Sequence, residues 1–257
     1  MRLDVFLAEK GLVKSRERAK NLVIDGKVSV DGVIVNKPSF EVVYQNVSVS
    51  EDYKYVGRGG YKLEKALDYF KIDVENLTAI DIGASTGGFS DCLLQRGVKK
   101  IFAVDVGHGQ LDKKILNDER VVNLEGVNIR SLSANSMDSA DIIVVDLSFI
   151  SLKLVLSELL KFLKTNGMVI CLLKPQFETG KIKNKGVVRD KKVHFSVVHK
   201  IVDFAVDCGF FIRGLTFSPI KGSDGNIEYL IYMDQKKHSE YVFDIHDLVN
   251  NAFENLE

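Results

Sequence analysis

A glycine-rich segment between a predicted strand and a predicted helix carries the strongest chemical signal in the sequence. It reads Asp81-Ile82-Gly83-Ala84-Ser85-Thr86-Gly87-Gly88-Phe89-Ser90, at the place where an open α/β sheet presents a ligand-binding loop. A dinucleotide-binding loop needs a bare glycine at its middle position for close approach to a pyrophosphate, and here that position is Ser85. The three glycines still permit a tight turn, so we expect a ligand without a pyrophosphate.

Two acidic residues indicate what this ligand is. Asp105 comes 24 positions after Asp81, at the end of the next predicted strand, where a carboxylate can accept hydrogen bonds from both hydroxyls of a ribose. Asp81, at the entrance of the loop, suits an ammonium group and repels phosphate. The pattern predicts S-adenosylmethionine as the cofactor. The alternative is that the glycines serve only a strand-to-helix turn. Asn128 and Ile129, after the third strand, are assigned to an adenine pocket by position.

Charge is distributed unevenly along the chain. Thirty-five basic and 35 acidic residues cancel, and a neutral total by itself argues against a nucleic-acid partner. Residues 10–37 nevertheless carry a net charge of +4 and residues 174–200 a net charge of +6, whereas residues 238–257 carry −5 with no lysine or arginine. Such basic patches are typical of phosphate contacts. The predicted RNA-binding residues are Lys14, Arg16, Arg18, Lys20, Lys27, Arg58, Lys181, Lys183 and Lys185.

Apolar periodicity divides the chain into two parts. Residues 1–52 predict two helices and a small sheet, with Ser15 capping the second helix and Asp31-Gly32 turning a hairpin. From Tyr61 onward helices and strands alternate. The predicted strands are 78–82, 101–104, 121–124, 142–146, 168–173, 210–217 and 227–233. No long helix joins the last two, which predicts an antiparallel pair at one edge of a mostly parallel sheet.

The predicted organisation is an α/β protein with a small companion domain. It has an α+β domain over residues 1–52, a linker over 53–60, a sheet domain over 61–235, and an acidic amphipathic tail over 236–257 that is expected to pack on the chain's own core. Three cysteines and five histidines show no metal-ligand or triad spacing, so no metal site is expected. No apolar run approaches the roughly 20 residues that cross a bilayer, and no secretory signal is recognisable, which favours the cytoplasm.

Five segments identify a resemblance to a known family. DIGASTGGFSDCLL, DVGHGQL, VVDLSFISL, LLKPQFE and SPIKGSDGNIEYL resemble the TlyA family, called haemolysins historically and ribosomal RNA 2′-O-methyltransferases by activity. The resemblance covers residues 1 to about 233. It implies a Rossmann-like class I methyltransferase sheet, an S-four-type RNA-binding domain at SRERAKNLVIDGKVSVDGVIV, and ribosomal RNA or ribosomal subunits as partner. It also implies a cytidine 2′-hydroxyl as the methyl acceptor.

The sheet domain is similar to FtsJ-like methyltransferases, which use a Lys-Asp-Lys-Glu set at the 2′-hydroxyl. Carried over by motif, these four residues are Lys62, Asp146, Lys174 and Glu228. Asp146, which is also assigned to the cofactor site, and Lys174 come at strand ends, and Glu228 opens the last strand. Lys174 is the candidate general base, with its pKa lowered by Lys62, although either lysine could take the proton. Asp146 and Glu228 are expected to hold the lysines in place.

Smaller features complete the expectations for this site. Pro175 disfavours helical geometry at the residue before it, so Lys174 is expected to be extended, with a mobile loop following it. Phe149 and Phe177 are interpreted as core residues, with a place in the cleft as the alternative. Three other functions remain as alternatives: a non-catalytic RNA-binding protein, a membrane-active haemolysin, and a pseudouridine synthase, which the glycine loop disfavours.

Overall fold

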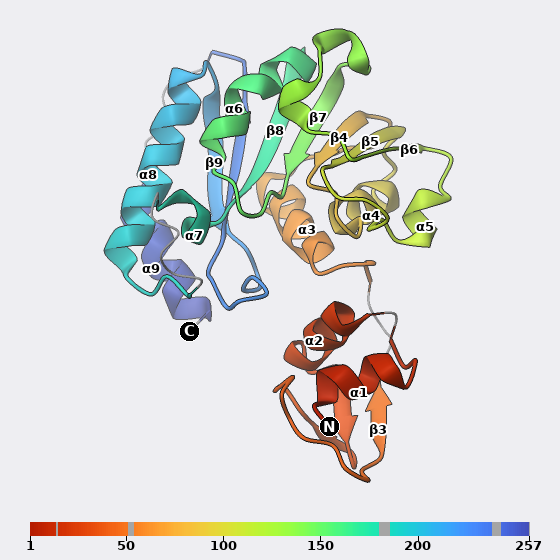
Figure 1. Ribbon diagram of the computed structural model, residues 1–257. Coiled ribbons are helices and arrows are strands. Elements are labelled where there is room, and N and C mark those ends of the chain that lie inside the picture. Colours follow the sequence, from red (N-terminus) through yellow and green to blue (C-terminus); the bar gives the residue numbers. More distant parts are fainter. Residues whose placement is uncertain (14, 51–53, 180–185, 238–242, 257) are drawn as a thin grey trace. The chain divides into compact units, whose positions relative to one another are not determined.

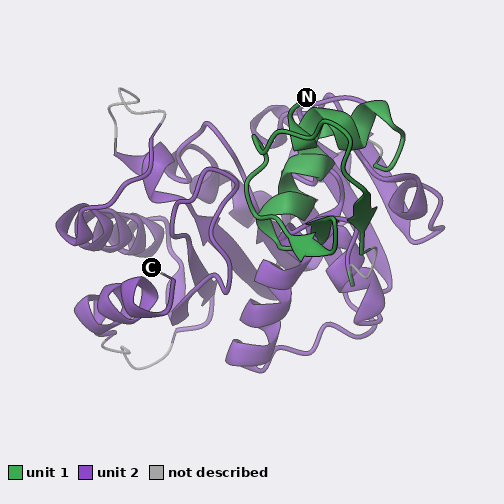
Figure 2. Ribbon diagram, turned by 90° about the horizontal axis from the view of Figure 1, so that it is seen from below, with its two compact units in different colours: residues 1–54 green, residues 55–257 purple. Residues whose placement is uncertain are grey.

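A computed structural model describes residues 1–13, 15–50, 54–179, 186–237 and 243–256. The chain divides into two compact units, Met1–Lys54 and Tyr55–Glu257 (Figure 2). No helix among these residues is long and apolar enough to cross a membrane.

The smaller unit contains two helices and a three-stranded antiparallel sheet. Helices α1 (Leu3–Glu9) and α2 (Arg16–Ile24) enclose a core with strands β1 (Val28–Val30), β2 (Val33–Ile34) and β3 (Val47–Val49), in the order β2-β1-β3. The Ser15 hydroxyl accepts the Arg18 N–H at 3.2 Å, which confirms the predicted cap. Asp31 and Gly32 both have positive φ and turn β1 into β2, as predicted.

The larger unit is built on a seven-stranded sheet in the order β6-β5-β4-β7-β8-β10-β9 (Figure 1). Strands β4 to β8 are parallel, and β10 is antiparallel to both β8 and β9, which confirms the predicted edge. The strands are β4 (Thr78–Ile82), β5 (Lys100–Asp105), β6 (Val121–Glu125), β7 (Ala140–Val145), β8 (Leu163–Leu173), β9 (Phe211–Phe217) and β10 (Tyr229–Asp234).

Helices cover both faces of this sheet because its side chains alternate between them. Ile80 and Ile82 pack into the core that includes α6 (Lys153–Leu159), α8 (Lys191–Asp207) and α9 (Ile245–Leu256). Ala79 and Val144 pack into the opposite core with α3 (Gly59–Phe70), α4 (Gly88–Gln95) and α5 (Lys113–Leu116). Three short 3₁₀ helices are η1 (Ile129–Ser131), η2 (Ala134–Ser136) and η3 (Leu160–Phe162), and the short helix α7 spans Pro175–Glu178.

Two segments differ from expectation. Helix α3 begins at Gly59, inside the segment predicted as a linker, because the glycines allow close packing: a Cβ at Gly60 would lie 2.2 Å from the Tyr55 ring. The loop expected after Lys174 begins instead as α7, with Pro175 in its first turn, a position that suits proline. The rest of that predicted loop, including its expected mobility, falls largely on residues 180–185, outside the described residues. The C-terminal helix α9 buries Val249, Ala252 and Phe253 in the main core, as expected for the amphipathic tail.

Candidate active site

The glycine-rich loop joins β4 to α4 with a backbone that requires glycine. Gly83 and Gly87 have φ of +84° and +91°, which L side chains rarely adopt. A Cβ at Gly83 would lie 2.4 Å from the carbonyl oxygen of Asp146, so the loop approaches the end of β7 closely. Ser85 and Thr86 are exposed at the tip. The remaining predicted loop residues, which are buried and support this tip, are Ala84, Gly87, Gly88 and Phe89.

Asp105, at the end of β5, fixes the loop from the neighbouring strand. Its Oδ2 accepts the Ser85 N–H at 2.8 Å, and its Oδ1 accepts the Gly107 N–H at 2.7 Å. Each carboxylate oxygen can accept more than one hydrogen bond, and the side chain is only half-buried. Asp105 can therefore hold the loop and still accept hydrogen bonds from a ribose.

The surroundings of Asp81 suit a positively charged cofactor. The side chain is fully buried, Oδ2 accepts a hydrogen bond from the Ser90 hydroxyl at 2.7 Å, and Oδ1 has no hydrogen-bond partner among the described residues. Burial raises the pKa of this carboxyl to about 7, and the charges of Asp146 and Asp105 also raise it. Three carboxylates at the ends of β4, β5 and β7 thus repel one another. An ammonium or sulfonium group would relieve this repulsion, whereas phosphate would increase it.

The predicted adenine pocket follows β6. Asn128 accepts the Arg130 N–H at 3.1 Å through its side-chain oxygen and so caps η1, and Ile129 is buried. Their contact with adenine stays a prediction. Val106, next to Asp105, leaves 69% of its surface exposed and offers apolar surface beside the predicted ribose-binding position. Sequence reasoning missed Val106, although its place after the strand-terminal acid was the available signal.

The four residues carried over from the FtsJ-like pattern form two ion pairs. Lys62 Nζ, in the first turns of α3, donates to Glu228 Oε2 at 2.5 Å, and both side chains are at least 90% buried. Lys174 Nζ lies 2.6 Å from Asp146 Oδ1. Lys174 also donates to the Ser148 hydroxyl at 2.9 Å, a contact that sequence reasoning missed. Lys174 has φ −113° and ψ 103°, which confirms its predicted extended backbone.

The charges of these pairs act on each other. Burial by itself lowers the pKa of Lys174, but the carboxylates of Asp146 and Glu228 outweigh burial and raise that pKa above its ordinary value. Burial raises the pKa of Asp146, but Lys174 and Lys62 together bring it below its ordinary range. The expectation that Lys62 and burial lower the pKa of Lys174 toward neutrality is therefore wrong, because the protein's own carboxylates raise that pKa. Lys174 keeps its proton at neutral pH because two carboxylates act on it.

Phe149 is not a core residue, contrary to expectation. Its side chain is 82% exposed, and its φ of +66° lies in a region that a bulky residue rarely occupies. The ring centroid lies 5.1 Å from that of Phe177, which is half-buried on α7. This aromatic pair follows Asp146 and Lys174 closely along the chain, so the alternative place beside the cleft is the better interpretation.

Glu178 in the KPQFE motif holds α7 in place. Its Oε2 accepts the Ser151 hydroxyl at 2.5 Å, and its Oε1 accepts the Leu152 N–H at 2.7 Å. Both partners lie directly before α6. Glu178 therefore fixes the segment that carries Lys174 and Phe177.

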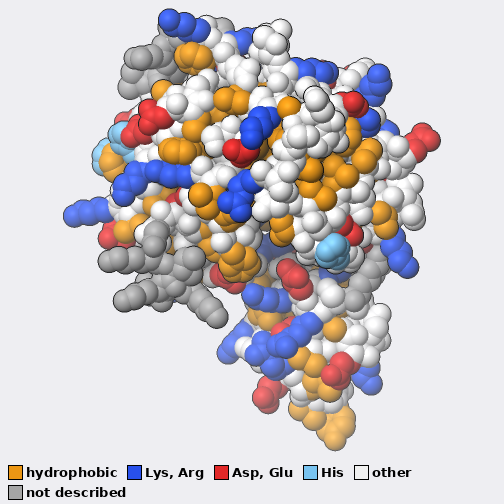
Figure 3. Space-filling model, turned by 45° about the horizontal axis from the view of Figure 1, so that its top comes forward, with side chains coloured by type: hydrophobic (Ala, Val, Ile, Leu, Met, Phe, Trp, Pro, Cys, Tyr) orange, Lys and Arg blue, Asp and Glu red, His pale blue; other side chains and the backbone are white. Residues whose placement is uncertain are grey.

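The predicted RNA-binding residues have different surroundings. Arg16 is exposed, and its Nε lies 3.0 Å from the buried carboxylate of Asp4, so it also supports the fold. Arg58 donates from Nη2 to the Lys221 carbonyl oxygen at 2.8 Å. Arg18, Lys20 and Lys27 are half-buried in the smaller unit, where Figure 3 shows lysine and arginine side chains on the visible face. Four predicted residues lie outside the described residues: Lys14, Lys181, Lys183 and Lys185.

Curated relatives match most of this chain. "Hemolysin A" of Brachyspira hyodysenteriae is 41% identical over 237 residues, which cover 90% of this chain and 99% of the relative. "16S/23S rRNA (cytidine-2'-O)-methyltransferase TlyA" of Mycobacterium tuberculosis is 39% identical over 238 residues, which cover 90% of this chain and 89% of the relative.

Solved structures agree with this relationship. "Putative hemolysin from Streptococcus thermophilus" is 40% identical, has a TM-score of 0.78, and covers 99% of this chain and 96% of its own. An S-adenosylmethionine dependent methyltransferase from Mesorhizobium loti is 14% identical, with a TM-score of 0.51 over 69% of this chain and 99% of its own, and shares the fold.

Family models describe both units. The model for FtsJ-like methyltransferase matches residues 55–235, and the model for the S4 domain matches residues 1–43. The chain therefore belongs to the FtsJ-like methyltransferases, and an S4 domain precedes its methyltransferase domain, as the resemblance to TlyA proteins predicted.

Proposed function

We propose that this protein transfers a methyl group from S-adenosylmethionine to a ribose 2′-hydroxyl of ribosomal RNA. The observation that carries the proposal is the presence of two ion pairs, the buried Lys62–Glu228 and the largely buried Lys174–Asp146, beside the carboxylate cluster of the glycine loop. Cytidine is the proposed nucleotide, because the relative from Mycobacterium tuberculosis has that specificity in its name. The S4 domain supports RNA as the substrate.

The proposed cofactor site uses side chains from two neighbouring strands, β4 and β5, and from the loop that follows β4. Asp105 receives the ribose hydroxyls, Asp81 faces the ammonium end, and the exposed tip at Ser85 and Thr86 borders the ligand. When bound, the cofactor supplies a methyl group that its sulfonium already activates. The protein must then align a ribose 2′-oxygen with that methyl group and take the hydroxyl proton.

Lys174 and Lys62 are the groups that act on the 2′-hydroxyl. The Lys174 ammonium, held by Asp146 and Ser148, can donate to the 2′-oxygen and stabilise negative charge as it develops there. Lys174 can accept the proton only after it loses its own. Positive charge brought next to Asp146 offsets the carboxylates that retain that proton, so we propose that the pKa of Lys174 falls when the site fills. Lys62 supplies a second positive charge, positioned by Glu228.

Purified protein, a labelled methyl donor and ribosomal subunits test this proposal. We expect label on a 2′-hydroxyl and a loss of transfer of at least about a hundredfold in Lys174→Ala, the scale of a lost acid–base group. Lys99→Ala is the control, because Lys99 is exposed and precedes β5, at the opposite edge of the sheet. Transfer retained in Lys174→Ala removes Lys174 from the mechanism. Absence of cofactor binding by calorimetry would favour a non-catalytic RNA-binding protein.

A further inference from the structure

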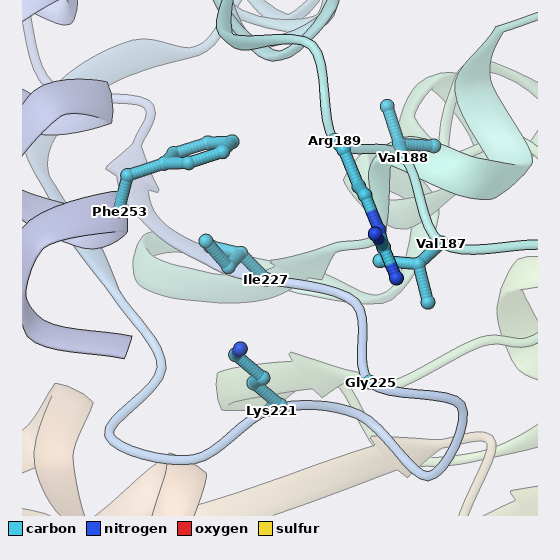
Figure 4. Close-up of a pocket in the computed structure, with 7 residues that line it drawn as sticks. All are labelled: Val187, Val188, Arg189, Lys221, Gly225, Ile227 and Phe253. Atoms are coloured by element: carbon cyan, nitrogen blue, oxygen red, sulfur yellow. The ribbon is translucent and has the colours of Figure 1, made fainter. Parts of the chain in front are cut away.

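A basic pocket lies beside the proposed catalytic residues and is not used by the mechanism. It has a volume of about 400 Å³, within the range of about 300–1,000 Å³ typical of ligand sites. Its lining residues come from the segment before α8, from the loop between β9 and β10, and from α9: Val187, Val188, Arg189, Lys221, Gly225, Ile227 and Phe253 (Figure 4).

The charge of this pocket is positive and uncompensated. Arg189 and Lys221 have no hydrogen-bond or ion-pair partner for their side chains among the described residues, and no acid is among the lining residues. Figure 4 shows that the Lys221 side chain extends toward Ile227 and that the Phe253 side chain projects from α9. Ile227 and Phe253 are 4% exposed each and form an apolar floor. Two cations above an apolar floor suit an anion that carries a flat apolar group.

Buried polar side chains hold the walls of the pocket in place. Asn226 Oδ1 accepts the Val188 N–H at 2.9 Å. The His194 ring lies with Nε2 2.8 Å from the Val188 carbonyl oxygen and Nδ1 2.9 Å from the Tyr229 hydroxyl. All three side chains are fully or almost fully buried. The Val188 backbone is thus fixed from both sides, and the pocket is formed before any ligand arrives.

The pocket and the proposed catalytic site share one segment of chain. Ile227 lines the pocket, and its neighbour Glu228 pairs with Lys62. A Cβ at Gly222, next to Lys221, would lie 2.5 Å from Glu228 Oε1. Arg58 holds the Lys221 backbone through its carbonyl oxygen. A strand of RNA with one nucleotide at the Lys62–Glu228 pair could therefore reach the pocket with an adjoining nucleotide.

We propose that this pocket binds a nucleotide of the RNA strand that flanks the methylated one. Arg189 and Lys221 hold its phosphate, with the arginine suited to bidentate contact, and Ile227 and Phe253 contact its base. The inference rests on the proposed function, because it takes RNA as the substrate. It adds a binding subsite and two residues that sequence reasoning did not assign.

The test compares two double variants that each remove two positive charges. Arg189→Ala/Lys221→Ala removes both charged side chains that line the pocket. Lys99→Ala/Lys236→Ala is the control, because both lysines are exposed and lie at the opposite edge of the sheet, before β5 and after β10. The readouts are RNA affinity without cofactor at several salt concentrations, KM and kcat for methyl transfer, and cofactor affinity.

We expect the pocket variant to raise Kd and KM for RNA about tenfold and to reduce the magnitude of the slope of log Kd against log salt by about 0.7, the effect of one lost phosphate contact to a single strand. The cofactor affinity of the pocket variant should stay within twofold of the wild-type value. The control variant should stay within twofold of wild type in RNA affinity, KM, kcat and cofactor affinity. A pocket variant that binds RNA like the control overturns the inference.

Two further outcomes separate this inference from the proposed function. Wild-type protein that binds RNA without methylating it refutes the proposed function, and weaker RNA binding by the pocket variant then still supports the subsite. Cytidine and adenosine 5′-monophosphates are titrated as free ligands. If the pocket variant no longer bound these monophosphates but kept the wild-type affinity for RNA, the pocket would be a site for free nucleotides and the inference would be overturned.

Discussion

Asp81 is a residue of the candidate site whose pKa departs far from its ordinary value. Its folded pKa of about 7 lies above the ordinary 3.8, because the carboxyl is fully buried beside two other carboxylates. The folded protein therefore binds this proton more tightly than the unfolded chain does. The resulting stability is present below about pH 4, falls as pH rises toward 7, and is lost above it.

Asp81→Asn should remove this pH dependence. The amide is neutral at every pH. The free energy of unfolding of the variant, relative to that of wild type, should therefore increase as pH rises from 4 to 7, by up to about 4 kcal/mol. Urea denaturation at pH 4.5 and 8 measures the gain, and Asp207→Asn, at an exposed position, is the control. The same change should weaken S-adenosylmethionine binding. A variant equally destabilised at both pH values would show that Asp81 is not protonated in the folded state.

Phe149 contributes an aromatic face at the edge of the proposed site. Because the ring is 82% exposed, Phe149→Ala should change the free energy of unfolding by less than about 1 kcal/mol. Base stacking on aromatic side chains is worth roughly 1–3 kcal/mol per base, so kcat/KM for RNA should fall about tenfold or more. Phe149→Tyr, which keeps the ring, should retain activity. Equal losses in both variants would indicate that the backbone, rather than the stacking surface, was disturbed.

At the scale of elements, sequence periodicity located the strands but not the environment of their ends. The predicted strand at 78–82 matches β4. Strand β8, by contrast, starts at Leu163 and not at the predicted 168, because the polar residues Lys164, Thr165 and Asn166 interrupt the apolar pattern by which a strand is recognised. Apolar content made Phe149 look like a core residue, since nothing in the sequence reveals a positive φ. The raised pKa of Lys174 depends on Asp146 and Glu228, which only the fold brings near it.

The β4–α4 turn provides a prediction at this scale. Gly83→Ala combines a φ of +84° with a Cβ 2.4 Å from the Asp146 carbonyl oxygen, so the ends of β4 and β7 must separate. Gly209→Ala has a φ of +96° but nothing within 4 Å, and it isolates the cost of backbone strain, about 1–2 kcal/mol. We expect the Tm of Gly83→Ala to fall further than that of the control, with loss of cofactor binding only in Gly83→Ala. Equal Tm values would mean that the close approach contributes nothing.

For the whole molecule, a neutral total conceals a division of charge that matters for RNA. The basic segments at residues 10–37 and 174–200 are offset by acids elsewhere, including five in residues 238–257. Attraction to phosphate acts over about a Debye length, roughly 8 Å at physiological salt. Local charge therefore decides RNA binding, and the net charge of zero does not oppose it.

Salt dependence tests this view on the intact protein. Each phosphate contact to a single strand contributes roughly −0.7 to the slope of log K against log salt. Four such contacts would give about a fiftyfold loss of RNA affinity for a fourfold rise in salt. Arg18→Ala should make the slope shallower, because Arg18 lies in the basic segment of the S4 domain. Glu254→Gln, in the acidic C-terminal segment, changes the net charge by one unit in the opposite direction and should leave the slope unchanged. If Glu254→Gln shifted the slope by as much as Arg18→Ala does, in the opposite direction, binding would follow the total charge of the protein and the basic segments would have no special part in it.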